Sequence, residues 1–281
     1  MTEMNIAFCI NNSYADKVAV VMTSVLENHP DEQLHFYVFS SDLTEKSLQL
    51  LQKLQSKYKN FTLQHIVVPR NRVKSLPLPV EYIPAEAYYR YFIADLLPAL
   101  DKVLYLDADL IVCKNITDFY NTDLGDCYLA GAEGLYATET GHKQHIGLDN
   151  KDIYINSGVL LMNLKQFRQN NLSKKLISTT KKLHSIIKYA DQDIINIVCR
   201  NKIKLVNSIY NFTQHNILRE KDKINSACII HYTGCKKPWG KQAKKVALAD
   251  IWKKYAQITD SIVLSPTIYK IKKCLLKIFN I

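Results

Sequence analysis

The first two thirds of the chain alternate short apolar runs with stretches in which apolar residues recur at helical spacing. A short apolar run favours a buried strand, whereas apolar residues spaced three or four apart favour an amphipathic helix. The pattern predicts strands at residues 5–10, 34–39 and 61–68, with helices at 16–27 and 43–58 between them. This β-α-β-α-β order predicts an α/β sheet with crossover helices.

The alternation resumes after a proline-punctuated loop at residues 77–84 and an aromatic segment at 87–97. Within the first part, Thr44 is the expected N-cap of its helix, with Ser47 at the N3 position. The later patterns predict strands at 102–106, 110–112, 128–132 and 158–162, and helices at 172–187 and 193–200.

Charge is concentrated at the C-terminus. The net charge of the 281 residues is +11, but residues 236–281 alone hold eleven lysines against two acids. The other 235 residues carry 26 basic and 24 acidic side chains, so they are nearly neutral. A basic surface running along the whole chain, as nucleic-acid binding would favour, is therefore not expected.

The last sixteen residues have the pattern of an amphipathic helix. On a helical projection the apolar side chains lie on one side and most lysines opposite, with Lys272 as the exception. A helix of this kind favours an anionic lipid surface, although packing on the domain would use the same apolar stripe. We expect a main domain at 1–240 and a basic helical region at 241–281. The stripe consists of Ile268, Ile271, Leu275, Ile278 and Phe279, and the opposite lysines are Lys270, Lys273 and Lys277.

Seven scattered cysteines, with no Cys-x-x-Cys pair, favour free thiols in a reducing compartment over a disulfide or metal framework. The N-terminus lacks the basic segment of a signal peptide, and no apolar run approaches the ~20 residues of a membrane span. We therefore expect a cytoplasmic protein that is at most peripheral to the inner face of the cell membrane.

Two carboxylates follow the apolar run at 102–106. In extended geometry Asp107 and Asp109 would point to the same side, close enough to share one hard cation. Ligands of an open α/β sheet collect at the carboxyl ends of its strands, where this pair falls. The alternative is a solvated turn. A diphosphate-bound Mn²⁺ or Mg²⁺ would suit the pair.

A second candidate segment follows the apolar run at 227–230. His231 at its end is either a metal ligand, which would favour Mn²⁺ over Mg²⁺, or an ordinary core or surface histidine. Gly234 permits close backbone approach to a phosphate, and Lys237 can neutralise its charge.

Three weaker signals lie elsewhere in the chain. Asn156 and Gly158 precede a buried strand and suit either a sugar contact or a tight turn. Asp191 opens a helical pattern and could be its N-cap. Arg90 lies among aromatic residues, suited to a diphosphate or to an ordinary ion pair.

Taken in order, these segments resemble family 8 of the retaining glycosyltransferases, and within it the bacterial lipopolysaccharide α-galactosyl- and α-glucosyltransferases. The resemblance runs from about residue 5 to residue 239. It is carried by the Tyr88–Arg90 segment, KVLYLDAD, LGD at Gly125 and Asp126, KQHIG, NSGVLLMNL, DQD and HYTGCKKPW.

The resemblance implies a GT-A fold with a Rossmann-like mixed sheet, a UDP-hexose donor and transfer with retention of anomeric configuration. It implies that Asp107, Asp109 and His231 hold Mn²⁺, with Mg²⁺ as the alternative, and that Gln192 and Asp191 are catalytic. The donor-binding residues that it implies are Phe8, Cys9, Ile10, Asn11 and Tyr14 in the uridine loop, Ala108 beside the ribose, Gly234 and Lys237 at the diphosphate, and Arg90, Asn156, Asp191 and Gln192 around the sugar. Asp107 and Gly158 are expected in the donor site as well.

The resemblance also implies a mechanism. Gln192 aligns where an amide oxygen faces the anomeric carbon, and an amide is a poor nucleophile. We therefore expect the acceptor to attack from the side of the departing UDP, with Gln192 stabilising positive charge. The acceptor, a saccharide or a lipid-linked saccharide, is expected to meet loops near residues 134–149 and 211–225.

Three positions depart from the family pattern. Asn11 replaces an acidic residue and Ser13 an asparagine in the uridine loop, which leaves base selectivity open. Glu133 stands where a sugar-contacting Asp would align, which leaves the choice between galactose and glucose open.

Two other classes of protein are disfavoured by the sequence. A nucleotidyltransferase would show a Gly-rich, basic N-terminal loop, which NIAFCINNSY lacks. A non-catalytic sugar-binding or membrane-binding relative would be expected to lose a metal ligand, and all three are present.

Overall fold

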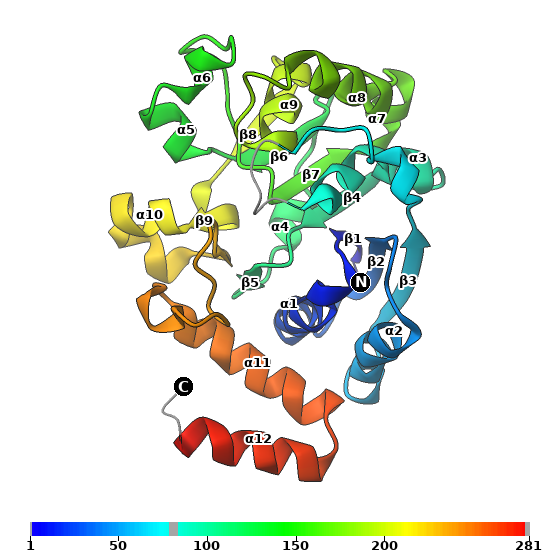
Figure 1. Cartoon of the computed structure of the whole chain (residues 1–281), viewed down its shortest axis with the longest axis vertical. Helices are drawn as coiled ribbons and strands as arrows, with labels where there is room; N and C mark the ends of the chain where they lie inside the picture. Colours follow the sequence, from blue (N-terminus) through cyan, green and yellow to red (C-terminus); the bar gives the residue numbers. More distant parts are fainter. Residues whose placement is uncertain (1, 79–83, 279–281) are drawn as a thin grey trace.

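A seven-stranded mixed sheet of order β3-β2-β1-β4-β7-β6-β8 forms the centre of the computed structural model (Figure 1). The structure describes residues 2–78 and 84–278, with side chains to residue 273, so part of the predicted loop at 77–84 lies outside the described residues. The strands are β1 (Glu3–Cys9), β2 (Gln33–Ser40), β3 (Phe61–Val67), β4 (Lys102–Leu106), β6 (Leu129–Ala132), β7 (Val159–Asn163) and β8 (Ile203–Val206).

Strand pairing in this sheet is Rossmann-like on one side and mixed on the other. β1 pairs in parallel with β2 and with β4, and β2 pairs in parallel with β3. β7 is antiparallel to both β4 and β6, and β8 is parallel to β6. The expected α/β fold with a mixed sheet is confirmed.

A second, three-stranded sheet lies beside the first. It has the order β5-β10-β9, with β5 (Leu110–Val112), β9 (Phe212–Thr213) and β10 (Ile229–His231). The chain leaves the large sheet after β4 and enters the small one at β5, so residues 107–109 form a bend between the two sheets. The two carboxylates therefore follow β4 as expected, but they lie in a bend rather than in extended backbone.

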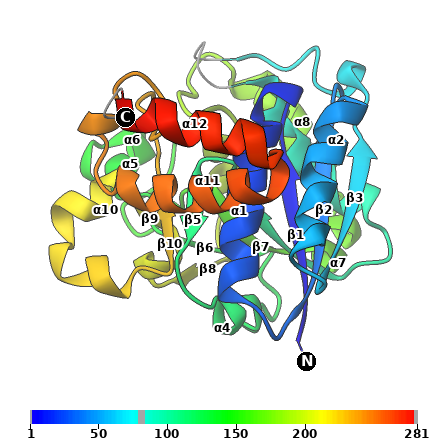
Figure 2. The ribbon, with the colours of Figure 1, turned by 90° about the horizontal axis from the view of Figure 1, so that it is seen from below.

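Helices cover both faces of the large sheet (Figures 1 and 2). Thr44 caps α2 by accepting a hydrogen bond from the Ser47 backbone N–H at 3.3 Å, as expected. The pattern predicted at 43–58 gives α2 and then a 3₁₀ turn at Lys53–Ser56, and the aromatic segment is largely a 3₁₀ helix, Ala85–Phe92. The α-helices are α1 (Ala15–Asn28), α2 (Glu45–Gln52), α3 (Ile93–Leu96), α4 (Thr117–Tyr120), α5 (Leu135–Glu139), α6 (His142–His145), α7 (Leu164–Gln169), α8 (Leu172–Leu183), α9 (Ala190–Val198), α10 (Gln214–Arg219), α11 (Ala249–Val263) and α12 (Pro266–Ile278).

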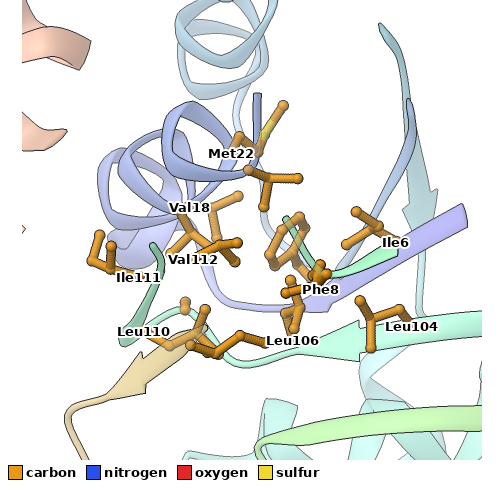
Figure 3. Packing of buried hydrophobic residues seen from close by; sticks show 14 of the residues in the cluster. Ile6, Phe8, Val18, Met22, Leu104, Leu106, Leu110, Ile111 and Val112 are labelled. Carbon is orange, nitrogen blue, oxygen red and sulfur yellow. The ribbon is translucent and has the colours of Figure 1, made fainter. Parts of the chain in front are cut away.

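The larger hydrophobic core lies between α1 and the two sheets (Figure 3). Val18 and Met22 of α1 face Phe8 of β1 and Leu106 of β4, and all four side chains are buried. This packing holds β1 and β4 side by side. Their carboxyl ends therefore open at the same edge of the sheet, where open α/β sheets bind ligands.

The C-terminal helices differ in how they meet this core. α11 packs on α1, where the Asn28 side chain donates to the Tyr255 hydroxyl at 2.9 Å and Thr259 Oγ1 bonds Thr23 Oγ1 at 2.8 Å. α12 lies outside α11 in both views (Figures 1 and 2). α11 thus shares the core of the main domain, while the boundary expected at residue 240 stays a prediction.

Two expectations about composition can be compared with the structure. The six cysteines whose side chains are described are free thiols, and Cys274 lies outside the described side chains. None of the helices in the described part of the chain combines the length and the apolar character that crossing a membrane requires.

Candidate active site

Asp107, Asp109 and His231 meet where the two sheets adjoin. One ligand atom from each lies within 4.8 Å of those of the other two. His231 Nε2 is 3.1 Å from Asp109 Oδ1 and 3.7 Å from Asp107 Oδ2. The antiparallel pairing of β10 with β5, which sets His231 opposite Leu110, brings the histidine to the bend that carries the carboxylates.

Gly158 leaves room for this cluster. A Cβ atom at residue 158 would lie 2.1 Å from His231 Cε1 and 2.7 Å from Asp107 Oδ2, both far below van der Waals contact. The position therefore excludes any side chain while the cluster keeps its geometry. Gly158 acts here through its lack of a side chain, and the sugar contact expected from the sequence stays a prediction.

Lys237 neutralises part of the charge of the two carboxylates. Its Nζ lies 2.5 Å from Asp109 Oδ2 and also donates to the Tyr232 carbonyl at 2.7 Å. Burial alone would raise the pKa of Asp109, but Lys237 and His231 hold that pKa well below its ordinary value. Asp109 is therefore ionised at neutral pH.

Arg90 is buried behind the cluster and holds two carboxylates. Its Nη2 lies 3.1 Å from Asp107 Oδ1 and its Nε lies 3.2 Å from Asp191 Oδ2. The Tyr105 hydroxyl also donates to Asp107 Oδ1, at 2.5 Å. Burial raises the pKa of Asp191 to about 6, against the opposing effect of Arg90. Asp191 is the second residue of α9, so it is not the N-cap.

The segment that the resemblance assigns to uridine binding follows β1 and lies beside the cluster. Cys9, Ile10, Asn11 and Tyr14 line the cavity described below. Phe8 does not: its ring is buried in the core, with its centroid 6.0 Å from that of Phe36. The strand alternates its side chains between the two faces, which sends Phe8 toward α1.

All the other site residues expected from the sequence line one cavity of about 640 Å³. That volume lies within the usual range for small-molecule sites. The lining also contains Tyr136 and His215, from the segments in which acceptor contacts are expected, and Tyr189, whose ring centroid is 6.2 Å from that of Tyr136. Glu133 is not among the lining residues, and its carboxylate accepts a hydrogen bond from Thr138 at 3.1 Å.

Gln192 lies in the cavity wall with both ends of its amide bonded. Its Oε1 accepts from Asn156 Nδ2 at 3.0 Å and from the Ser157 backbone N–H at 3.2 Å. Its Nε2 donates to the Tyr154 hydroxyl at 2.9 Å. The Tyr154 hydroxyl in turn donates to Asp193 at 2.6 Å. The amide is thus fixed by Asn156, which the sequence analysis named, and by Ser157 and Tyr154, which it did not.

The donor set fits a divalent cation. Carboxylate oxygens together with an imidazole nitrogen suit Mn²⁺, and the carboxylate oxygens alone are ligands that Mg²⁺ prefers. Among the residues that the structure describes, this is the one cluster of three or more His, Cys, Asp or Glu side chains with metal-binding spacing.

A family model decides the class of this protein. The model described as "Glycosyl transferase family 8" matches residues 5–243. The chain belongs to glycosyl transferase family 8. The resemblance carried by the sequence motifs is confirmed, and the protein is a glycosyltransferase enzyme.

Two similar proteins are named as lipopolysaccharide glycosyltransferases. A lipopolysaccharide 1,2-glucosyltransferase of Escherichia coli is 29% identical, over 84% of this chain and 73% of that protein. A lipopolysaccharide 1,3-galactosyltransferase of Salmonella typhimurium is also 29% identical, over 84% of this chain and 73% of its own length.

A solved structure confirms the GT-A fold. The galactosyltransferase LgtC, crystallised with donor and acceptor sugar analogues, is similar with a TM-score of 0.84 and 27% sequence identity. The match covers 95% of this chain and 99% of LgtC.

Proposed function

We propose that this family 8 enzyme transfers a hexose, galactose or glucose, from a UDP-sugar to a saccharide acceptor, with retention and with Mn²⁺ at the Asp107–Asp109–His231 cluster. The acceptor, free or lipid-linked, would be a precursor of lipopolysaccharide or of another cell-surface glycan. The observation that carries the proposal is the three-ligand cluster in the wall of the 640 Å³ cavity, at the carboxyl ends of β1 and β4.

The charges around the cluster suit a diphosphate. When bound, a divalent cation would act as a Lewis acid on the diphosphate and offset the charge that develops as UDP departs. Lys237 supplies a cationic donor at the same place, and Gly234 has a left-handed backbone (φ 82°) that suits glycine. Tyr14 and Asn11 line the cavity where the resemblance puts the uridine.

The amide of Gln192 supports attack from the leaving-group side. Its oxygen already accepts two hydrogen bonds, which reduces the electron density that it could donate to a carbon. Covalent catalysis by Gln192 is therefore disfavoured. Its carbonyl dipole can still stabilise positive charge at the anomeric carbon, while the departing phosphate oxygen accepts the acceptor proton.

A donor panel tests this proposal. The enzyme would be incubated with Mn²⁺ and one of four donors: UDP-galactose, UDP-glucose, ADP-glucose or GDP-glucose. The released nucleoside diphosphate and free sugar would then be measured. We expect UDP and hexose from one or both UDP-sugars, and much less product from the others. Release of pyrophosphate from a nucleoside triphosphate and a sugar phosphate would instead indicate a nucleotidyltransferase.

We further propose that α12 attaches the enzyme to an anionic membrane surface, at the cytoplasmic face of the cell membrane. Ile268 and Ile271 are 54% and 56% exposed, so these two members of the apolar stripe do not pack on the domain. Lys270 and Lys273 are exposed beside them, and Lys272 pairs with Asp260 of α11 at 2.6 Å. Each lysine near an anionic surface contributes about 1 kcal/mol.

A further inference from the structure

We propose that Asn211 is a positioning residue that joins the metal ligand His231 to Asn156 and Gln192 in the cavity wall. The inference rests on the proposed metal site and donor site, and it assigns a role to a side chain that sequence reasoning did not identify.

Asn211 lies at the end of the 3₁₀ helix Ser208–Asn211, directly before β9, and is 1% exposed. β9 pairs in parallel with β10, with Thr213 opposite His231, so the residue just before β9 lies within side-chain reach of the histidine. Its Oδ1 is 2.8 Å from His231 Nδ1, and its Nδ2 donates to Asn156 Oδ1 at 2.8 Å. Both ends of a buried amide are therefore used.

A backbone group sets the direction of these bonds. The Gly158 N–H, which can only donate, bonds Asn156 Oδ1 at 3.0 Å. That oxygen is therefore an acceptor, and the atom of Asn211 that faces it must be the amide nitrogen. Asn211 Oδ1 is left to face His231, so the hydrogen must be on His231 Nδ1. His231 Nε2 faces Asp109 Oδ1 at 3.1 Å, and a cation that binds between Asp107 and Asp109 would take the Nε2 lone pair in place of that contact.

The same argument fixes the direction of the hydrogen bonds around Gln192. The Ser157 N–H bonds Gln192 Oε1, so this atom is the amide oxygen, and Asn156 Nδ2 donates to it as well. The Tyr154 hydroxyl gives its hydrogen to the Asp193 carboxylate and so accepts from Gln192 Nε2. Asn156 thus bonds both Gln192 and Asn211, and Asn211 connects this chain of hydrogen bonds to His231.

Asparagine is suited to this place because it offers one acceptor and one donor. An aspartate would still accept from His231 Nδ1–H, but it would set an oxygen against Asn156 Oδ1, where a donor is needed. A leucine would supply neither bond. Partners that orient a metal-bound histidine typically change metal affinity 10- to 100-fold when they are removed. The two substitutions should therefore separate the two links.

The test compares Asn211→Leu, Asn211→Asp and a matched control, Asn207→Asp. Asn207 caps the same 3₁₀ helix by accepting from the Ile209 N–H, a role that aspartate retains. Mn²⁺ affinity would be measured by calorimetry without donor, and kcat and KM by UDP release. Circular dichroism would report folding, and NMR of ¹⁵N-labelled protein would show which nitrogen of His231 carries hydrogen, with His231→Gln used to assign the signal.

We expect Asn211→Leu to weaken Mn²⁺ binding about 10- to 100-fold. Asn211→Asp should bind Mn²⁺ within about 3-fold of the original protein, or more tightly, yet lose about 10-fold or more in kcat with little change in donor KM. Asn207→Asp should alter neither quantity. The original protein should show a hydrogen on His231 Nδ1.

Two results would overturn the inference. One is unaltered Mn²⁺ affinity in Asn211→Leu, and the other is a hydrogen on His231 Nε2 with none on Nδ1 in the unaltered protein. The second needs no substitution at Asn211, so it decides the matter even if the Asn211 variants do not fold. It is also separate from the proposed function: a protein that binds no Mn²⁺ would refute the metal site, whereas the His231 signal would still test the role of Asn211.

Discussion

At the scale of single residues, each predicted metal ligand has a second partner that holds it. Arg90 and Tyr105 hold Asp107, and Lys237 holds one oxygen of Asp109. Such partners fix the orientation of ligands before a cation binds. The site therefore depends on buried polar groups as much as on the three ligands.

Gly158→Ala tests the space that the cluster needs. The added methyl group would overlap His231 and Asp107, so we expect Mn²⁺ affinity to fall about 10-fold or more, measured by calorimetry. Gly131→Ala is the matched control, because its Cβ would meet the end of the flexible Ile155 side chain at 2.8 Å, outside the cluster. Unchanged Mn²⁺ affinity in a folded Gly158→Ala protein would show that the cluster does not bind the metal.

Gln192→Ala tests the role of the amide in the transition state. If the side chain stabilises developing positive charge, kcat should fall roughly 10- to 1000-fold with little change in donor KM. The exposed Gln49→Ala serves as the control. A raised KM with normal kcat would reduce Gln192 to a binding residue, and a glycosyl adduct trapped on any side chain would refute same-face attack.

At the scale of elements, apolar runs predicted β4 and β5 to the residue, because Asp107 and Asp109 interrupt the apolar sequence between them. Periodicity was less informative over α2, where the apolar spacing continues to Tyr58 but the backbone tightens into a 3₁₀ turn after Gln52. A single turn of 3₁₀ helix, with three residues per turn, and a single turn of α-helix, with 3.6, place apolar side chains on nearly the same face. The apolar pattern could therefore not distinguish the two kinds of helix.

The site was predictable only where its residues lie in a short motif. Asp107, Asp109 and His231 follow apolar runs and could be found in that way. Asn211 has no motif of its own, and only the pairing of β9 with β10 brings it to His231. The bend at residues 107–109 was likewise hidden, because the sequence does not show that β4 and β5 belong to different sheets.

α12 carries the prediction at this scale. Deleting residues 266–281 should leave hydrolysis of a soluble UDP-sugar largely intact, since α12 lies outside α11, and should abolish sedimentation with anionic vesicles. Binding of the full chain should weaken as salt rises. Ile268→Ser combined with Ile271→Ser keeps the charge and should weaken binding less than the deletion does. Vesicle binding that survives the deletion would locate the membrane contact elsewhere.

At the scale of the whole molecule, each of the two sheets positions a different part of the candidate site. The large sheet brings the carboxyl ends of β1 and β4 together, and the small sheet brings His231 and Asn211 to the same place. α11 packs against α1 and supports the large sheet from outside. The fold thus builds one cavity that is lined by the Asp107–Asp109–His231 cluster and by the aromatic residues Tyr136 and His215.

The measurement that tests the central claim most directly is UDP release from a UDP-hexose by the unaltered enzyme and by Asp109→Asn, each with Mn²⁺ and with EDTA. The exposed Asp250→Asn is the control. We predict that EDTA abolishes release by the unaltered enzyme and that added Mn²⁺ restores it. Asp109→Asn should remain folded and inactive in both conditions. Near-normal release in EDTA, by either the unaltered enzyme or the variant, would contradict a metal-dependent glycosyl transfer at this cluster.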